Sequence, residues 1–139
     1  MRVLSDTIQL HSAGEGDIID ITTQLSTIVK KSKIRNGTVT IFVSGSTAAV
    51  TTIEYEPGLV HDFPKMLSRI VPKEIEYQHD NTWHDGNGHS HIRSSLIGPS
   101  ITVPIISGKL TLGTWQQVVL LEMDTRSRNR TLILQLIGE

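Results

Sequence analysis

The last third of the chain most constrains the fold, because its apolar residues follow the pattern of strands and not of helices. Gly108, Gly113 and Asn129 mark turns within this third. Runs that are apolar or alternating, and rich in β-branched residues, lie at residues 101–107, 109–124 and 130–138. We therefore expect the C-terminal third to consist of strands that pair mostly antiparallel.

The first two thirds add helices to these strands. A helix is predicted at residues 17–33, where Asp17 occupies the N-cap position. A second is predicted at residues 59–71, where Pro64 is tolerated only in the first turn. Further strands or extended segments are predicted at residues 3–10, 38–43 and 50–56. Two helices and about seven strands define one α+β domain that spans residues 1–139.

Composition sets what this domain contains and binds. Of 139 residues 37% are apolar but only 4% are aromatic, so the core must consist of Ile, Leu and Val. The net charge of -1 gives no electrostatic reason to expect nucleic acid or an acidic membrane as partner. No apolar run approaches the roughly 20 residues of a membrane span. Cysteine is absent, which fits a cytoplasmic protein and restricts any metal site to nitrogen and oxygen donors.

Residues 76–98 carry the densest chemistry. Four of the six histidines fall between positions 79 and 91, interleaved with Asp80, Asp85 and Asn87. Imidazole binds borderline metals and titrates near physiological pH, so this clustering indicates a metal site or a proton-transfer site. The stretch is too rich in Gly, Asn and Asp for a regular element, so a loop is predicted, with either a helical turn or a strand after it. On extended backbone His89 and His91 share one face. A hydrogen-bonded surface loop is the alternative.

Small and acidic residues elsewhere supply weaker candidates. The corner Gly45–Thr47 lets the backbone approach an oxyanion closely, although a plain turn is the better explanation of these residues. Glu54 and Asp62 gain weight only if the fold brings them to the histidines, because lone carboxylates are usually solvated. Trp115 is expected in the core or in an interface.

Three arginines alternate near the C-terminus, at positions 126, 128 and 130. On extended chain their guanidinium groups align, and guanidinium binds phosphate bidentately. A salt-bridged hairpin is the alternative.

Taken together, these motifs resemble one family over nearly the whole chain. The resemblance runs from GSTAAVTTIEYEPGLVHD through PKEIEYQHD to NGHSHIRSSLIGPSITVPIISGKLTLGTWQQVVLLEMDTRSRNR. Its most specific parts are Tyr-x-His, Asn followed by His, and Gly-x-Trp-Gln before a Glu and an arginine-rich turn. The chain is similar to the YjbQ-like family, also labelled the secondary thiamine-phosphate synthase family.

The resemblance implies an α+β fold with a β-sandwich, a homotrimer whose sheets pack around a threefold axis, and a polar site near subunit boundaries. The family's polar positions fall on Thr47, Glu54, Asp62, His79, Asn87, His91, Gln116 and Arg128, with His89 as a helper. Many members carry a histidine where this chain has Gly45. Either His84 or His89 replaces it here, or the chemistry differs.

Three functions are weighed for these residues. The first is an enzyme with weak thiamine-phosphate synthase activity, which forms a C–N bond and releases pyrophosphate. Its expected catalytic residues are His79, His91, Glu54 and Asp62. Its expected contacts to a small phosphorylated metabolite are Ser46, Thr47, Asn87, Gln116, Arg126 and Arg128. Its expected ligands for a divalent metal, Zn or Mg, are His79, His89 and His91. The second function is a non-catalytic trimer that binds a metal or small anion, and the third is a phosphate-ester hydrolase.

Overall fold

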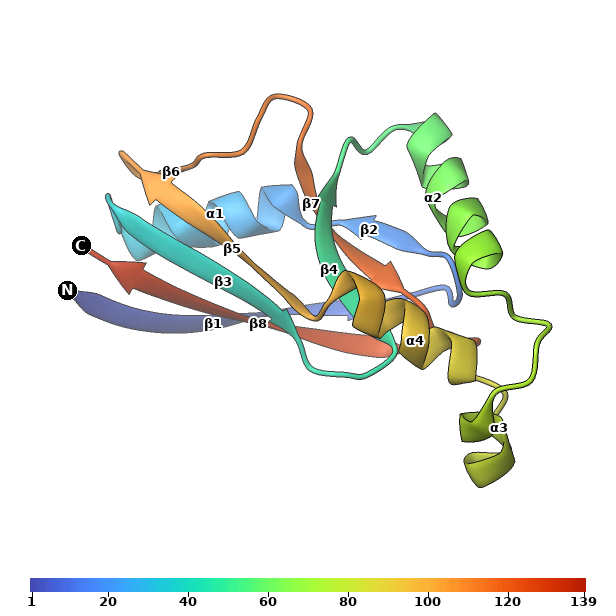
Figure 1. The fold of residues 1–139 in the computed structure, drawn as a ribbon. Helices are drawn as coiled ribbons and strands as arrows, with labels where there is room; N and C mark the ends of the chain where they lie inside the picture. The colour runs from blue at the N-terminus through green and yellow to red at the C-terminus, as the bar shows by residue number, and fades with distance from the viewer.

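The structure is a computed structural model that describes residues 1–139, in which eight strands and four helices form one domain (Figure 1). In chain order the elements are β1 (Arg2–His11), β2 (Ile18–Asp20), α1 (Thr22–Ser32), β3 (Gly37–Val43), β4 (Ala48–Ile53), α2 (Pro57–Ile70), α3 (Gln78–Trp83), α4 (Gly88–Ile97), β5 (Ser100–Ile106), β6 (Lys109–Leu110), β7 (Gln117–Glu122) and β8 (Asn129–Gly138).

All neighbouring strands pair antiparallel, in two sheets. The larger sheet has the order β1-β8-β3-β5-β6 and the smaller has the order β2-β7-β4. The longest pairing joins the two ends of the chain, because β1 runs beside β8 from Arg2 opposite Gly138 to His11 opposite Asn129. Both termini therefore lie at the same end of the domain (Figure 1). The expected α+β class, the mostly antiparallel pairing and the strands of the C-terminal third are confirmed.

The smaller sheet is buried on both faces. One face shares the main apolar cluster with the larger sheet and α1, through residues such as Leu25, Leu120 and Leu134. The other face packs against α2, where Val119 meets Leu67. A strand covered on both sides needs apolar residues at successive positions, which explains the run QVVLLE of β7. The same run carries the carboxylate at its end into the interior.

The first two predicted helices are misplaced at their starts. Residues 18–20 form β2 because Ile18 pairs with Leu121 of β7, so α1 begins only at Thr22. Asp17 does not cap that helix, since its carboxylate accepts the N–H of Ala13. Helix α2 begins at Pro57, so Pro64 lies inside the helix and not in its first turn.

The histidine-rich stretch is not a loop, and the expected number of two helices is wrong. It forms α3 and α4, and its glycines and Asn87 lie between or at the ends of these helices. Gly86 adopts φ 69° between them, and Gly88 opens α4 against Tyr77. A Cβ on Gly88 would lie 2.6 Å from Cβ of Tyr77, so only glycine allows this close approach. Sequence composition suggested a loop because glycine is common both in loops and at the ends of helices.

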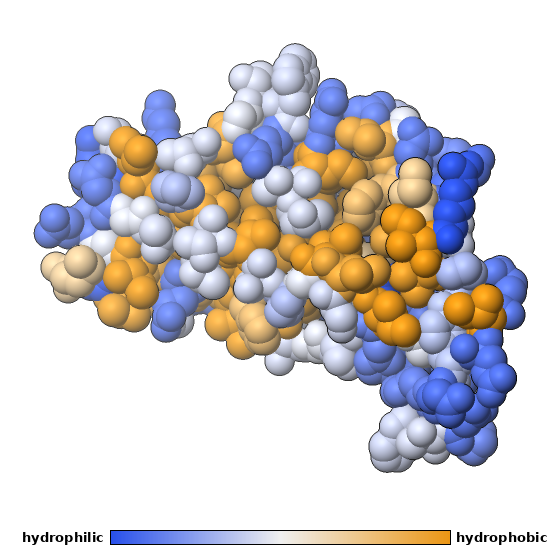
Figure 2. Space-filling view, viewed as in Figure 1, coloured by the Kyte–Doolittle hydropathy of each residue, from blue (hydrophilic) through white to orange (hydrophobic).

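Hydrophobic side chains reach the surface over α2 and α4 (Figure 2). They include Met66 and Ile70 on α2, and Ile92 and Leu96 on α4. None of the helices is both long and apolar enough to cross a membrane.

Candidate functional site

A buried ion pair lies where β7 ends and β8 begins. Arg130 donates from Nε and Nη2 to the two carboxylate oxygens of Glu122, at 2.8 and 2.6 Å. Only 7% of the Arg130 side chain and none of the Glu122 side chain is exposed. Nη2 also donates to the hydroxyl of Thr47 at 2.8 Å, and Ser12 donates its hydroxyl to Glu122. The pair therefore fastens the turn after β3 to both strands.

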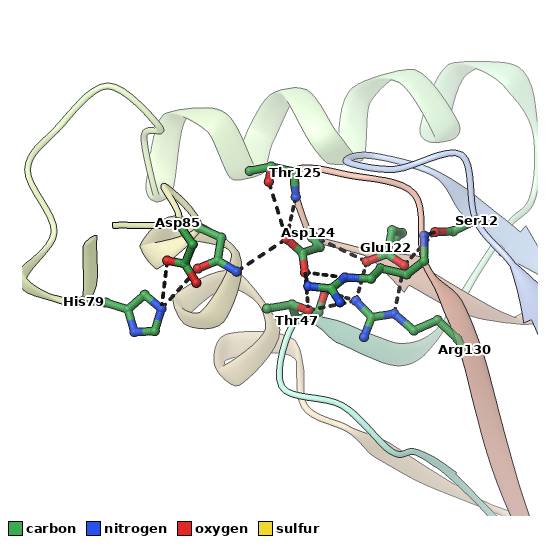
Figure 3. A network of polar contacts seen from close by, with 10 residues as sticks. Ser12, Thr47, His79, Asp85, Glu122, Asp124, Thr125 and Arg130 are labelled. Carbon is green, nitrogen blue, oxygen red and sulfur yellow. Dashed lines mark hydrogen bonds and ion pairs between the residues drawn. The ribbon is translucent and has the colours of Figure 1, made fainter. Parts of the chain in front are cut away.

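Asp124 extends this network toward the surface (Figure 3). One carboxylate oxygen accepts the Thr47 hydroxyl at 3.0 Å and Nη2 of Arg128 at 2.7 Å. The other accepts the backbone N–H of Thr125 at 2.8 Å. Burial raises the pKa of Asp124, but these hydrogen bonds outweigh burial and lower the pKa to about 2. Asp124 is therefore a fixed negative charge at neutral pH.

Asn87 connects Asp124 to His79. Its amide nitrogen lies 3.4 Å from Asp124, and its amide oxygen lies 3.1 Å from Nε2 of His79. Turning the amide over lets its nitrogen donate to Asp85 at 2.9 Å and to His79 at 3.1 Å. The first orientation requires a proton on Nε2 of His79 and the second requires that nitrogen to be bare. The orientation of Asn87 is thus coupled to the protonation of His79.

His79 of α3 and His91 of α4 face each other. Their ring centres lie 4.3 Å apart, and a carboxylate oxygen of Asp85 lies 3.5 Å from Nε2 of His79. Burial and the nearby His79 lower the pKa of His91, although surrounding aspartates oppose this effect. His91 is therefore a neutral base at pH 7. Folding therefore brings together His79, Asn87 and His91, three of the predicted site residues.

His89 does not join them, and the expectation that it shares a face with His91 is wrong. Residues two apart point to different sides of a helix, and α4 is a helix and not extended chain. Only 1% of the His89 side chain is exposed, and its Nε2 contacts Glu15. Lys73 and Arg93 lie beside the same carboxylate, at 3.3 and 3.6 Å. Despite opposing burial, His89 and Lys73 lower the pKa of Glu15.

The three predicted metal ligands are therefore divided between two places. His79 and His91 are nitrogen donors beside Asp85, whereas His89 is committed to Glu15. No group of three or more His, Asp or Glu side chains is gathered closely enough to hold a metal ion. The donors therefore do not fit a preformed three-histidine centre.

Several other predicted residues lie away from the histidines. Strand β4 begins directly after Thr47, which belongs to the ionic network, and Glu54 follows its other end. About seven residues of extended chain, on the order of 20 Å, therefore separate Glu54 from Thr47. Near it, Gln116 donates to the Thr52 hydroxyl. Asp62 lies on α2 with 71% of its side chain exposed, beside His61. The fold of a single chain does not bring these side chains to His79.

The remaining predictions concern the arginines, Trp115 and Ser46. The three guanidinium groups do not align, because the chain turns after Asp124; the salt-bridged alternative holds for Arg128 and Arg130. Arg126 is exposed. Trp115 is 72% exposed in the single chain, so it is not in the core. Ser46 is exposed on the turn after β3, whereas the Thr47 hydroxyl is already bonded within the network.

Two surface cavities differ in what lines them. One of about 480 Å³ lies between the turn after β3 and α4, and it is lined by Gly45, Ser46, His91 and Ser94 among others. The largest, about 820 Å³, lies between α1 and the segment after β6, and its basic residues are Lys30, Lys33, Arg35 and Lys109. The smaller cavity adjoins the histidine pair through His91.

Sequence reasoning missed Glu122 and Asp124 as members of the site, and it considered Arg130 only as one of three alternating arginines. A signal was present: Glu122 and Asp124 directly continue the apolar run of β7. Charged residues at the end of a doubly buried strand are rarely left unpaired. Glu15, which orients His89, gave no signal because it lies 74 residues away in sequence.

Fold and site together define a two-sheet α+β domain with paired histidines beside a buried ionic network. The chain belongs to the family described as UPF0047 protein YjbQ-like, whose model matches residues 6–139. A UPF0047 protein of Methanothermobacter thermautotrophicus is 37% identical over 139 residues, 100% of this chain and 95% of that protein. A UPF0047 protein of Archaeoglobus fulgidus is 36% identical over 126 residues, 91% of this chain and 96% of the relative.

Solved structures agree with the fold. The crystal structure of a YbjQ-like protein of unknown function from Sulfolobus solfataricus matches with a TM-score of 0.93 and 34% identity, over 99% of both chains. A hypothetical protein from Aeropyrum pernix K1 matches with a TM-score of 0.87 and 30% identity, over 100% of both chains. The predicted family is confirmed, and these relatives carry no named activity.

Proposed function

We propose that this protein is an acid–base enzyme that acts on a small phosphorylated metabolite, and that it has weak thiamine-phosphate synthase activity. The observation that carries the proposal is the His79–His91 pair at the surface end of the buried network. His91 is a neutral base at pH 7, and His79 is oriented by Asp85 and Asn87. Two imidazoles in contact, one of them neutral, are suited to moving a proton during a reaction.

The synthase reaction has matching requirements. A thiazole ring nitrogen forms a bond to the methylene carbon that joins the pyrimidine ring to its diphosphate, the C–O bond breaks, and its electron pair leaves with pyrophosphate. Negative charge grows on the leaving oxygen, so cationic and N–H donors nearby favour the reaction. In the proposal, a ring N–H of the histidine pair donates a hydrogen bond to that oxygen. Arg128, with 34% of its side chain exposed, supplies a guanidinium whose Nη1 has no partner in the chain.

We also propose that the protein is a homotrimer. No helix covers the outer face of the larger sheet (Figure 1), and its side chains include no ionisable group over most of four strands. They are Val3, Ser5, Thr7, Gln9, Thr38, Thr40, Phe42, Thr102, Pro104, Ile106, Thr131, Ile133, Gln135 and Ile137. Light scattering should give three times 15.4 kDa, and Ile133→Lys should give a smaller species. A monomeric wild type contradicts the trimer.

A metal-binding protein without catalysis is the second candidate. The same pair favours it, because His79 and His91 are two neighbouring nitrogen donors, which suit Zn better than Mg. If this candidate is right, Zn should raise the melting temperature and a chelator should lower it, while no substrate is turned over.

Turnover of the two phosphorylated halves of thiamine phosphate tests the proposal. Product and released pyrophosphate are measured for the wild type, with and without chelator, and for His79→Gln and His91→Gln. Each substitution should lower the rate about 100-fold, the lower range for a lost proton-transfer group. His84→Asn is the matched control, because His84 is exposed in the same stretch, and asparagine tolerates its φ of 58°.

The outcomes separate the candidate functions. Equal rates for the wild type and both histidine variants remove this pair from the mechanism. Release of inorganic phosphate from either substrate, without joining, assigns a phosphate-ester hydrolase in place of the synthase. Absence of any turnover, together with stabilisation by Zn, assigns the metal-binding protein.

A further inference from the structure

The turn between β3 and β4 has three backbone donors without acceptors. Ser44 donates its N–H to the carbonyl of Thr131, and β4 begins its ladder at Ala48. Between them, the N–H groups of Gly45, Ser46 and Thr47 donate to no group in the chain. Successive free N–H groups in a turn are a common way in which proteins bind oxyanions.

A guanidinium nitrogen lies directly beside this turn. Arg130 uses Nε and Nη2 for Glu122 and Thr47, but Nη1 has no hydrogen-bond partner. Figure 3 shows this nitrogen of Arg130 without a dashed line. A Cβ placed on Gly45 would lie 2.7 Å from Nη1. Glycine at position 45 therefore lets the turn approach closely a cation that its other contacts hold in place.

An orphan hydroxyl faces the same region. Ser94 of α4 is 5% exposed, its Oγ has no partner, and Ser94 lines the 480 Å³ cavity together with Gly45, Ser46 and His91. A buried hydroxyl without a partner is unfavourable unless a ligand or water satisfies it. No carboxylate lines this cavity, so nothing in its wall repels an anion.

We infer that these groups form an oxyanion subsite for the phosphate group of the metabolite, made of the N–H groups of residues 45–47, Nη1 of Arg130 and Oγ of Ser94. The inference rests on the proposed function, because it places the phosphate beside the base His91. It assigns the binding of phosphate to Arg130 and Ser94, and it gives Gly45 a role: a side chain there closes the subsite. Because Glu122 neutralises Arg130, recognition depends on directed hydrogen bonds more than on net charge.

Phosphate binding without turnover tests the subsite. Inorganic phosphate and pyrophosphate are titrated separately into the full-length protein, and backbone amide shifts are followed by NMR. The amides of residues 45–47 should move first. Gly45→Ala and Ser94→Ala should each weaken binding about fivefold or more, the effect of losing one hydrogen bond.

Ser90→Ala is the matched control. Ser90 is on the same helix, equally buried and equally without a partner, but it does not line the cavity. Ser90→Ala and Ser94→Ala should both keep or raise the melting temperature, and only Ser94→Ala should lose phosphate affinity. Equal affinities for the two variants overturn the role of Ser94, and unchanged affinity in Gly45→Ala overturns the subsite.

Two further variants test where the phosphate binds and whether binding is separable from turnover. Lys33→Glu alters the large basic cavity; if this variant alone loses phosphate binding, the anion binds there and the inference is wrong. His79→Gln should keep phosphate affinity, because His79 is outside the subsite. Loss of turnover in His79→Gln with retained binding supports both proposals. Intact subsite binding without any turnover in the wild type rejects the enzyme proposal and keeps the subsite.

Discussion

Glu122→Gln is the sharpest test of how the domain holds its charges. The substitution keeps the shape of the side chain and removes its charge, which leaves Arg130 buried without a counter-charge. Gln still offers one oxygen to accept from Arg130, but its NH₂ group then faces a donor where the second carboxylate oxygen accepted Nη2 at 2.6 Å.

The expected loss in the free energy of unfolding is large for the replacement of one carboxylate oxygen by an NH₂ group. Breaking a buried pair by removing one partner costs about 3–5 kcal/mol, mainly because the remaining charge cannot be hydrated. Since 1 kcal/mol shifts the melting temperature of a domain of this size by about 3–4 °C, we expect a fall of about 9–20 °C. Ser12 adds to this effect, because its hydroxyl donates to the same carboxylate.

Urea unfolding followed by far-UV circular dichroism measures the change in free energy. Lys73→Met is the control, because its partner Glu15 forms an ion pair in which the Lys73 side chain is 53% exposed. That variant should lose less than about 1 kcal/mol. Arg130→Met combined with Glu122→Gln should recover part of the loss, which a double-mutant cycle quantifies. A cost below about 1 kcal/mol for Glu122→Gln would show that the pair is hydrated and the reasoning wrong.

Three further predictions concern pH and packing. Because the pKa of Asp124 is about 2 in the folded state against an ordinary value of 3.8, ionised Asp124 stabilises the fold fully above about pH 4, and this contribution is lost as the pH falls toward 2. Asp124→Asn should therefore make the free energy of unfolding depend less on pH between about 2 and 4. Because the pKa of His91 in the folded state is lowered from 6.5, the unfolded state takes up that proton at a higher pH, so stability falls as the pH drops below 6.5. NMR titration of His79→Gln should show a higher pKa for His91 than in the wild type. An unchanged pKa would contradict the coupling between the two histidines. Gly37→Ala should destabilise by about 1–3 kcal/mol through overpacking, because its Cβ would lie 2.1 Å from the carbonyl oxygen of Ile137. Urea unfolding should find a shift at least as large as that of Gly86→Ala, where a Cβ meets nothing and only the φ of 69° is strained.

The fold class was predictable because the alternation of apolar and polar residues in a strand repeats every two residues and can be recognised in the sequence alone. The strands at Val39–Val43 and in the last third follow from alternation or from continuous apolar runs. The start of α1 was not predictable in the same way. Ile18 satisfies a helical face and a strand equally well, and only pairing with Leu121, more than a hundred residues away, decides between them.

The candidate site shows the same division. The sequence alone identified His79 and His91 as candidates, because a dense cluster of histidines can be recognised without knowing the fold. Composition cannot tell which histidines face each other, since that depends on whether the backbone between them is helical. His89 is the clearest case: because α4 is a helix, residues two apart point to different sides, so His89 contacts Glu15 and does not share a face with His91. Sheet pairing that is long-range in sequence assembled the ionic network from Ser12, Glu122 and Arg130.

The two halves of the site rest on parts of the fold with different stability. The ionic network is anchored to β7, which is buried on both faces and is therefore expected to unfold only with the domain. His79 belongs to α3, a six-residue helix without a buried residue, and reaches the network through Asn87. Local opening of α3 therefore separates His79 from His91 without disturbing Arg130. If the enzyme proposal is right, hydrogen exchange should find α3 opening far more often than β7, and a bound phosphorylated ligand should slow that opening.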